Sequence, residues 1–385
     1  MPTSKGLYLH GPKTLVLEER PLPAPAATEI QIAIRSTTLC GSDVHYYTYH
    51  RNGSIQVKEP LCGGHEAAGE VVNIGSDVRD TGTLSVGDKV AIEPGVPCSR
   101  PECKKCMKGR YNVCPGLRFR SSGASFPHFQ GTLQEVVNHP ASWVHKLPVS
   151  LEFDDGALLE PLSVCIHAVR KARMEGGETC LVFGAGAVGL LSAAVVKIEH
   201  GCRVVIVDVD PGRVEFAVKE GFADVGFTVT PRKGETVDEK LGIAKDVARE
   251  IGELKWPGPE GERVGRVDVV LECTGVESCV QASIYAADSG GKVVLIGMGT
   301  AVQSWPISEL TAREIDIVSV WRYANCYPRA IEIMDAMASR GLTPDARKII
   351  THRFSGLDSI PDAYETAAKT KDGKGGLVIK TVVNL

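Results

Sequence analysis

A chain of 385 residues has room for two domains of ordinary size, and 43% hydrophobic with 23% charged residues is the balance of a globular protein. The formal net charge of −4 argues against partners that need a basic surface, such as nucleic acids or anionic membranes. No apolar run approaches the ~20 residues that span a bilayer, and the N-terminal residues lack the apolar core of a signal peptide, so we expect a cytosolic protein.

The chain contains twelve cysteines, and in a chain of this length we expect thiols and metal ligands rather than a disulfide framework. Seven of them stand among apolar or small neighbours, which favours buried thiols. These seven are Cys62, Cys165, Cys180, Cys202, Cys273, Cys279 and Cys326.

Residues 1–162 are expected to form a β-rich barrel with few helices. Short apolar runs such as 30–34, 69–74 and 87–92 are bounded by turn residues, a pattern typical of strands.

This first part of the chain carries a mixed set of candidate metal ligands in the segments Cys40-Gly41-Ser42-Asp43-Val44-His45 and Gly64-His65-Glu66. Cys40, His65 and Glu66 together offer a thiolate, an imidazole and a carboxylate, and three such ligands leave one position for water or substrate. Their spacing alone is weak support, because a single His or Glu is more often structural.

A second cluster has the spacing Cys98-x4-Cys103-x2-Cys106-x7-Cys114. Four thiolates in one short loop are typical of a closed tetrahedral zinc site that braces the loop and takes no part in chemistry. An oxidised cysteine pair or a coincidental grouping are the alternatives.

The pattern changes after residue 162. From 163 to 305, apolar β runs at 181–183, 204–207, 267–271 and 293–296 alternate with helical periodicity, which predicts a doubly wound parallel sheet. A polar insert around 231–264 contains one stretch with helical spacing and no recognisable chemistry.

A dinucleotide fingerprint follows the first of these strands. Gly184 permits the tight turn, Gly186 allows the backbone to approach a pyrophosphate, and Gly189 allows close helix packing. The N-terminus of the next helix would meet the negative charge of the phosphates. A glycine turn used only for packing is the alternative.

The next strand ends at an acidic residue, at the spacing expected for a contact to the adenosine ribose. Asp208 and Asp210 would repel a 2′-phosphate, and no basic residue follows at once, so the sequence favours NAD over NADP. Arg213 could stack on the adenine.

Taken together, motifs along nearly the whole chain resemble those of zinc-containing medium-chain dehydrogenases, in the polyol branch of sorbitol, xylitol and L-arabinitol dehydrogenases. The resemblance implies a GroES-like β-barrel catalytic domain of residues 1–162 and 306–385 and a Rossmann coenzyme domain of residues 163–305. The motifs are Cys40-Gly41-Ser42-Asp43-Val44-His45-Tyr46, Gly64-His65-Glu66-Ala67-Ala68-Gly69-Glu70-Val71, Glu160-Pro161-Leu162-Ser163-Val164, Glu272-Cys273-Thr274-Gly275 and Thr351-His352-Arg353-Phe354.

The resemblance also implies roles for individual residues. Cys40, His65 and Glu66 would bind a catalytic zinc, with Glu160 holding the metal's water or joining the ligands. The residues matching polyol contacts are Tyr46, Glu160, Arg322 and Tyr323; those matching cofactor contacts are Gly184, Gly186, Val188, Gly189, Asp208, Arg213, Ile296, Gly297, Met298, Val320, Trp321 and Arg322.

Three assignments stay open at this point. Ser42, with Glu160 and a water, could carry a proton outward or could make only a local hydrogen bond. His45 could act with them, touch a cofactor phosphate or simply pack. Arg322 is interpreted as a polyol contact, with an ion pair to a carboxylate as the alternative.

The expected activity is oxidation of an alditol to a ketose with NAD and zinc, with sorbitol as the first substrate. L-arabinitol, xylitol or galactitol are the alternatives, because residues 118–131 and 324–328 depart from the branch's usual pattern. A simple secondary-alcohol or threonine-type dehydrogenase, or a catalytically silent relative, fits less well. The family is generally tetrameric, so we expect a homotetramer that binds only small molecules.

Overall fold

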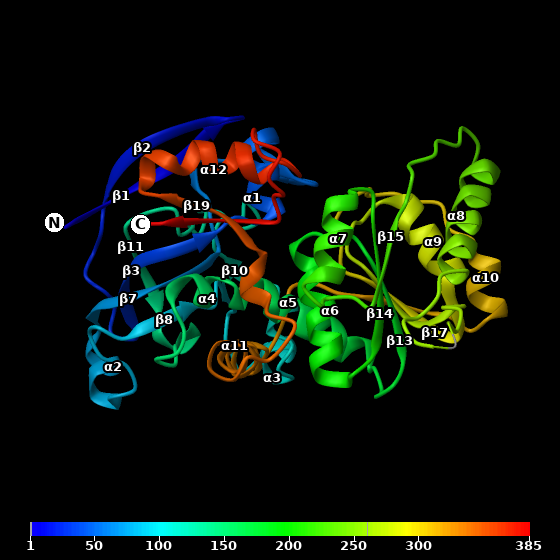
Figure 1. Ribbon diagram of the computed structural model, residues 1–385. Coiled ribbons are helices and arrows are strands. Elements are labelled where there is room, and N and C mark those ends of the chain that lie inside the picture. Colours follow the sequence, from blue (N-terminus) through cyan, green and yellow to red (C-terminus); the bar gives the residue numbers. More distant parts are fainter. Residues whose placement is uncertain (1, 260) are drawn as a thin grey trace. The chain divides into compact units, whose positions relative to one another are not determined.

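Figure 1 shows the computed structural model, which describes residues 2–259 and 261–385. The chain divides into two compact units. The first comprises Met1–Ser163, Ala324–Arg340 and Arg347–Leu385, and the second comprises Val164–Tyr323 and Gly341–Ala346. Within the described residues, no helix is both long enough and apolar enough to cross a membrane.

The first unit is built on a seven-stranded sheet that joins strands from the beginning and the end of the sequence. Its hydrogen-bonded order is β12-β8-β7-β3-β20-β19, and β11 also pairs with β3. The strands are β3 (Glu29–Thr38), β7 (Glu66–Ile74), β8 (Lys89–Ile92), β11 (Val136–Pro140), β12 (Val144–Lys146), β19 (Ile350–Ser355) and β20 (Lys380–Asn384).

A smaller sheet in the same unit has the order β2-β1-β6. Its strands are β1 (Thr3–Gly11), β2 (Thr14–Pro21) and β6 (Leu61–Cys62), and two further pairs join β4 (Arg51–Asn52) with β5 (Ile55–Gln56) and β9 (Gly95–Val96) with β10 (Arg118–Phe119). The helices of this unit are α1 (Gly41–Tyr49), α2 (Ser76–Thr81), α3 (Lys104–Met107), α4 (Phe153–Ala157), α11 (Tyr327–Arg340) and α12 (Ile360–Ala367).

One face of the large sheet is buried by side chains that occupy alternate positions along its strands. In β3, Ile30, Ile32 and Ile34 project from one face and pack with Val71 and Ile92 from the neighbouring strands. β3 therefore ends inside the protein at Thr38, directly before the segment that carries Cys40.

The second unit is a doubly wound sheet of six parallel strands with the order β15-β14-β13-β16-β17-β18. The strands are β13 (Thr179–Phe183), β14 (Arg203–Asp208), β15 (Val225–Thr228), β16 (Val267–Glu272), β17 (Ala287–Leu295) and β18 (Asp316–Ser319). The order reverses between β13 and β16, the place where such sheets bind ligands beyond the carboxyl ends of their strands.

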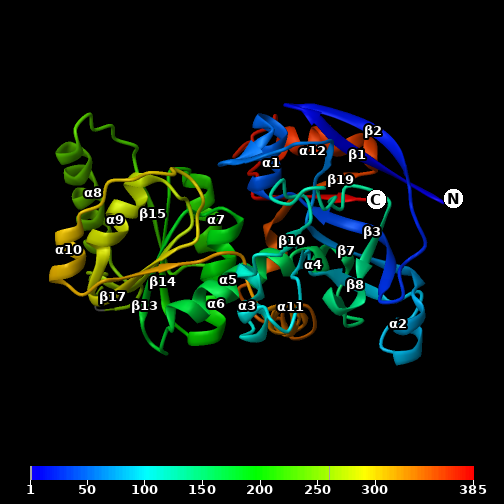
Figure 2. The same cartoon turned by 180° about the vertical axis from the view of Figure 1, so that it is seen from behind.

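Helices cover both faces of this sheet, as Figures 1 and 2 show: α6 and α7 lie on one face, and α8, α9 and α10 on the other. Their bounds are α6 (Ala187–His200), α7 (Pro211–Lys219), α8 (Val237–Gly252), α9 (Glu277–Ala286) and α10 (Ile307–Ala312). The residues of α5 (Leu159–Ala172) up to Ser163 belong to the first unit and those from Val164 to the second.

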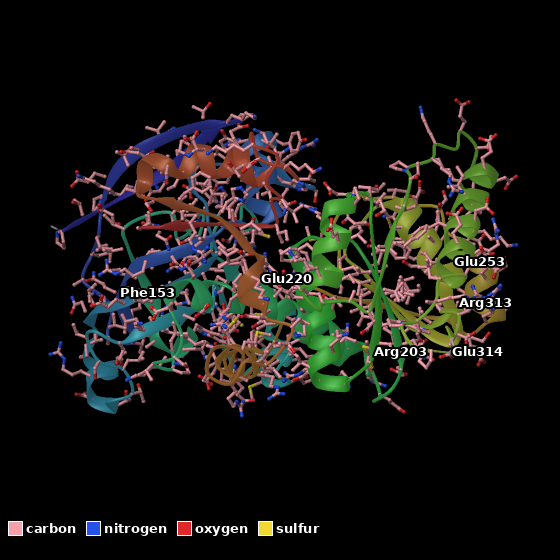
Figure 3. The ribbon with its side chains drawn as sticks, viewed as in Figure 1. Phe153, Arg203, Glu220, Glu253, Arg313 and Glu314 are labelled. Carbon is pink, nitrogen blue, oxygen red and sulfur yellow. The ribbon has the colours of Figure 1, made fainter. Side chains whose placement is uncertain are left out.

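The insert forms α8, as its helical spacing predicts. Thr236 and Glu239 make a reciprocal capping box at its start, and Val247 and Ile251 bury its apolar side. Glu253, labelled in Figure 3 just after the helix, lies 3.6 Å from Arg249 on the exposed side.

Two stretches of the expected catalytic domain, 306–323 and Gly341–Ala346, belong to the second unit. The coenzyme domain was expected to end at residue 305, but the second unit continues to Tyr323 and includes β18, which pairs in parallel with β17. β18 is an edge strand with exposed ends and a half-buried middle. It therefore lacks the continuous apolar run that marks the buried strands of a parallel sheet.

Candidate active site and metal centres

The four cysteines between residues 98 and 114 come together in the first unit. Their sulfur atoms all lie within 4.8 Å of one another, with individual pairs at 3.4 and 3.8 Å. Sulfurs placed tetrahedrally around zinc at the usual Zn–S length would be about 3.8 Å apart. All four are free thiols, so this cluster fits a closed zinc site rather than an oxidised pair.

The local backbone favours the charged form of one of these thiols. Cys103 stands at the N-terminal end of α3, and a hydrogen bond from the Cys106 backbone amide lowers the pKa of the Cys103 thiol to about 6. Metals bind the thiolate form.

The mixed ligand set also converges. The ligand atoms of Cys40, His65 and Glu66 lie within 4.8 Å of one another. Cys40 directly precedes α1, His65 directly precedes β7, and Glu66 is the first residue of β7, where it pairs with Thr38 of β3. A thiol, an imidazole and a carboxylate at this separation fit a zinc site with one open position.

His65 is oriented by partners on its Nδ1 atom. Ser121 Oγ lies 2.9 Å from this nitrogen and Asp43 Oδ2 lies 3.3 Å from it. Asp43 is itself fixed, because its carboxylate accepts hydrogen bonds from the backbone amides of Cys40 and Gly64. Burial lowers the pKa of His65, but the charge of Asp43 more than offsets this, so the pKa is raised overall.

Glu66 is held through one of its two oxygens. The Lys380 ammonium lies 2.5 Å from Oε2, and Thr38 Oγ1 donates a hydrogen bond to the same atom. Burial lowers the pKa of Lys380, but the carboxylate of Glu66 outweighs burial and raises it. Among the described residues Oε1 has no hydrogen-bond donor, so it is the oxygen left for a metal ion.

The other residues predicted around this cluster lie at different places in the first unit. Glu160 is buried at the start of α5, and its charge contributes to the raised pKa of Lys380. Tyr46 is buried on α1, and its hydroxyl accepts a hydrogen bond of 3.2 Å from the Gly123 amide. Ser42 is half-buried, whereas His45 is exposed with its Nδ1 3.3 Å from Asn52 Oδ1.

The second unit contains the glycine fingerprint between β13 and α6. Gly184 has a φ of +96°, and a side chain on Gly189 would meet the Gly184 carbonyl oxygen at 1.7 Å, so both positions require glycine. Gly186 caps α6, and Val188 follows in its first turn.

The predicted adenosine contacts lie beside this turn. The Asp208 carboxylate accepts hydrogen bonds from the backbone amides of Ala185 at 2.7 Å and Asp210 at 2.9 Å. A Cβ added to Gly186 would be 3.7 Å from Nη1 of Arg213, which places that guanidinium next to the turn.

The remaining cofactor candidates follow the ends of β17 and β18. The amides of Ile296 and Gly297 both donate to the Glu272 carbonyl oxygen, and exposed Met298 comes next. Val320 donates to the Leu295 carbonyl oxygen, and the Arg322 guanidinium lies 4.9 Å from the centre of the Trp321 ring. Tyr323, predicted to contact the polyol, is buried at the end of this segment.

Several residues that hold the ligands have no role in the sequence-based prediction: Thr38, Asp43, Ser121 and Lys380. Lys380 gave the one usable signal, since a charged residue that ends the apolar run 377–379 requires a partner if it is buried. Nothing in the sequence around Ser121 or Thr38 points to His65 or Glu66.

Two family models match the chain. Residues 26–149 match the alcohol dehydrogenase GroES-like domain, and residues 187–336 match the zinc-binding dehydrogenase domain.

Relatives of known name and solved structures match almost the whole chain. Sorbitol dehydrogenase of Bos taurus is 38% identical over 99% of this chain and 96% of its own, and that of Homo sapiens is 38% identical over 96% and 94%. An Escherichia coli oxidoreductase of unknown specificity is 29% identical with a TM-score of 0.81, covering 100% of this chain and 99% of its own. A Sinorhizobium meliloti zinc-binding dehydrogenase solved with NADP is 26% identical with a TM-score of 0.79, covering 100% of both chains.

The two matched domains, the shared sequence and the two metal-ligand clusters agree. This chain belongs to the zinc-containing medium-chain dehydrogenases, in the polyol dehydrogenase branch.

Proposed function

We propose that this dehydrogenase oxidises a secondary alcohol of an alditol to a ketose with NAD, and that its preferred alditol is sorbitol. The observation that carries the proposal is the convergence of Cys40, His65 and Glu66 beside the ends of β3 and β7. The identity of 38% to sorbitol dehydrogenases over nearly the whole chain supports the choice of substrate. In the balanced reaction the carbinol carbon gives a hydride to NAD⁺ and its hydroxyl gives a proton to solvent.

Cys40, His65 and Glu66 would hold a zinc ion, which would supply positive charge that lowers the pKa of a substrate hydroxyl. The residues around the ligands prepare them for that ion. Asp43 holds the imidazole of His65, and Lys380 balances the charge of Glu66 while leaving Oε1 available.

Other residues are proposed to handle the substrate and its proton. Glu160 and Ser42 would pass the hydroxyl proton toward solvent. The Tyr46 oxygen accepts a hydrogen bond from Gly123, so its own proton remains for donation to a polyol oxygen. Arg322 and Tyr323 would contact further hydroxyl groups.

The choice of NAD rests on the end of β14. Asp208 and Asp210 put two carboxylates at the carboxyl end of β14, and their charge would repel a 2′-phosphate bound there. The amide of Ala185 fixes the Asp208 carboxylate at the turn.

L-arabinitol, xylitol and galactitol remain alternative substrates. The segment 118–131 reaches Tyr46 through Gly123, and Asn325 is held by Tyr111 and Gly109. Both segments depart from the usual pattern of the branch. They would therefore alter which chain length and stereochemistry of polyol the protein prefers.

A panel of C5 and C6 alditols, assayed for NADH absorbance with NAD and with NADP, tests the substrate. Removing the metal with a chelator should lower alditol oxidation by at least about 100-fold, because the ion contributes several kcal/mol of charge stabilisation. Added zinc should restore it. Cys40→Ser should behave like chelated protein and Cys279→Ser, in the second unit, like wild type; full activity in chelated protein contradicts the proposal.

We further propose a cytosolic homotetramer. Twelve free cysteines favour a reducing compartment, and the branch that the chain resembles is generally tetrameric. Light scattering during size-exclusion chromatography tests the assembly, and a particle of any other subunit number contradicts it.

A further inference from the structure

The segment 119–121 contacts the imidazole of His65 from two directions. The Phe119 ring packs against the His65 ring at 5.4 Å between centroids, and Ser121 Oγ lies 2.9 Å from Nδ1. We propose that Ser121 is a positioning residue that orients His65 for zinc. This inference rests on the proposed function, because it takes His65 to be a zinc ligand.

The backbone at Ser121 is unusual for a residue with a side chain. Its φ is +58°, in the left-handed region that glycine adopts freely and other residues adopt at a cost. Ser121 is also buried, with 2% of its surface exposed. A glycine would adopt this φ without strain but has no side chain to contact His65. The hydroxyl is therefore what a serine supplies at this position and a glycine would not.

The hydroxyl is held in a fixed place. The Ser121 amide donates to the Phe129 carbonyl oxygen at 2.9 Å. The neighbouring Arg120 is buried, and its guanidinium donates to the Gln130 carbonyl oxygen at 2.8 Å and to His139 Nδ1 at 3.1 Å. Ser121 therefore belongs to a rigid part of the core rather than to a mobile loop tip.

A partner on Nδ1 decides what the other ring nitrogen can do. When Nδ1–H donates to Ser121 and Asp43, Nε2 keeps its lone pair and the ring plane is fixed, as a metal ligand requires. The contact to Ser121 is the shorter of the two, at 2.9 Å against 3.3 Å. Losing a partner of this kind typically costs ~10–100-fold in metal affinity. Because Asp43 remains, we expect about tenfold.

Three variants separate the hydroxyl from the backbone. Ser121→Ala removes only the hydroxyl, Ser121→Gly removes it and also relieves the positive φ, and Ser125→Ala is the control. Ser125 lies in the same loop, and its Oγ has no hydrogen-bond partner in the part of the chain that the structure describes. Zinc affinity is measured by competition with a chelator, using His65→Ala to identify the zinc bound at this site, and Tm is measured on metal-free protein.

We expect both Ser121 variants to bind this zinc about tenfold more weakly, while Ser125→Ala matches wild type. Ser121→Gly should at the same time keep or raise the Tm of the metal-free protein. Wild-type affinity in Ser121→Ala, or recovery of affinity in Ser121→Gly, would overturn the inference. If His65→Ala loses no zinc, the proposed function itself fails, which is a separate result.

Discussion

At the scale of single residues, a buried charge pair defines the site as much as the ligands do. Lys380 and Glu66 are 5% and 1% exposed, and the nitrogen of one lies 2.5 Å from an oxygen of the other. Removing one partner of such a pair leaves an uncompensated charge in the core, which is far more costly than losing an exposed pair.

We therefore expect Lys380→Met to lower the free energy of unfolding of the metal-free protein by about 3–5 kcal/mol. Zinc should reduce that loss, because its charge lies on the same carboxylate. Lys89→Met is the control: it breaks a pair with Glu152 in which Lys89 is half-buried and Glu152 is exposed, and should cost less than about 1 kcal/mol. Urea unfolding with and without zinc measures both, and equal losses in the two variants would contradict the prediction.

The convergence of Cys40, His65 and Glu66 could be predicted from sequence, whereas the contacts of most residues that support them could not. Cys40, His65 and Glu66 stand in short motifs that can be recognised locally. Lys380 reaches Glu66 only because β20 pairs with the far end of β3, so that Val382 lies opposite Thr38. No local pattern records a register between strands more than three hundred residues apart.

At the scale of elements, the four-cysteine segment connects to the chain well beyond the metal. Tyr111, between its third and fourth cysteines, donates to Glu93 at 2.5 Å and accepts from the Asn325 amide at 2.7 Å. The Asn325 side chain donates to the Gly109 carbonyl oxygen at 2.9 Å. The four-cysteine segment thus holds residue 325, close to the point where the chain re-enters the first unit at Ala324.

Without zinc, Cys103 should be the most reactive of the four cysteines. Its pKa of about 6 makes it mostly thiolate at pH 7, while the pKa of Cys106 is raised to about 12 by burial and by its neighbour. Mass spectrometry after brief iodoacetamide treatment should find Cys103 modified first, and zinc should protect it. Equal labelling of Cys103 and Cys106 in metal-free protein would show that this difference is absent.

In the coenzyme unit, the buried strands could be predicted from the sequence and the less buried edge strands could not. The four apolar runs of the sequence correspond to β13, β14, β16 and β17, which are covered on both faces. The edge strands β15 and β18 are not among these runs, and without β18 the unit was expected to end at residue 305. Periodicity reports how a strand is covered, so a half-covered strand leaves little signal.

At the scale of the whole molecule, the free energy of unfolding should depend on pH through a buried histidine that is not one of the proposed metal ligands. His139 is fully buried: its Nδ1 accepts hydrogen bonds from Arg120, and its Nε2 donates to the Glu93 carbonyl oxygen at 3.1 Å. Burial, and next the positive charge of Arg120, hold the pKa of His139 well below 6.5. Protonating Nδ1 would also replace the acceptor of the Arg120 guanidinium by a second donor, so the hydrogen bond would be lost.

The sign of the effect follows from proton binding. Below pH 6.5 the unfolded chain binds a proton at His139 that the folded protein does not, so stability is retained above that pH and lost as the pH falls toward the depressed pKa. One such group contributes a slope of about 1.4 kcal/mol per pH unit, or roughly 2 kcal/mol between pH 6.5 and pH 5. His139→Gln keeps an acceptor for Arg120 but does not titrate. Urea unfolding should give wild type a steeper loss than the variant over this range and the same slope above pH 7.5; parallel curves down to pH 5 would mean that His139 is protonated in the folded protein as well.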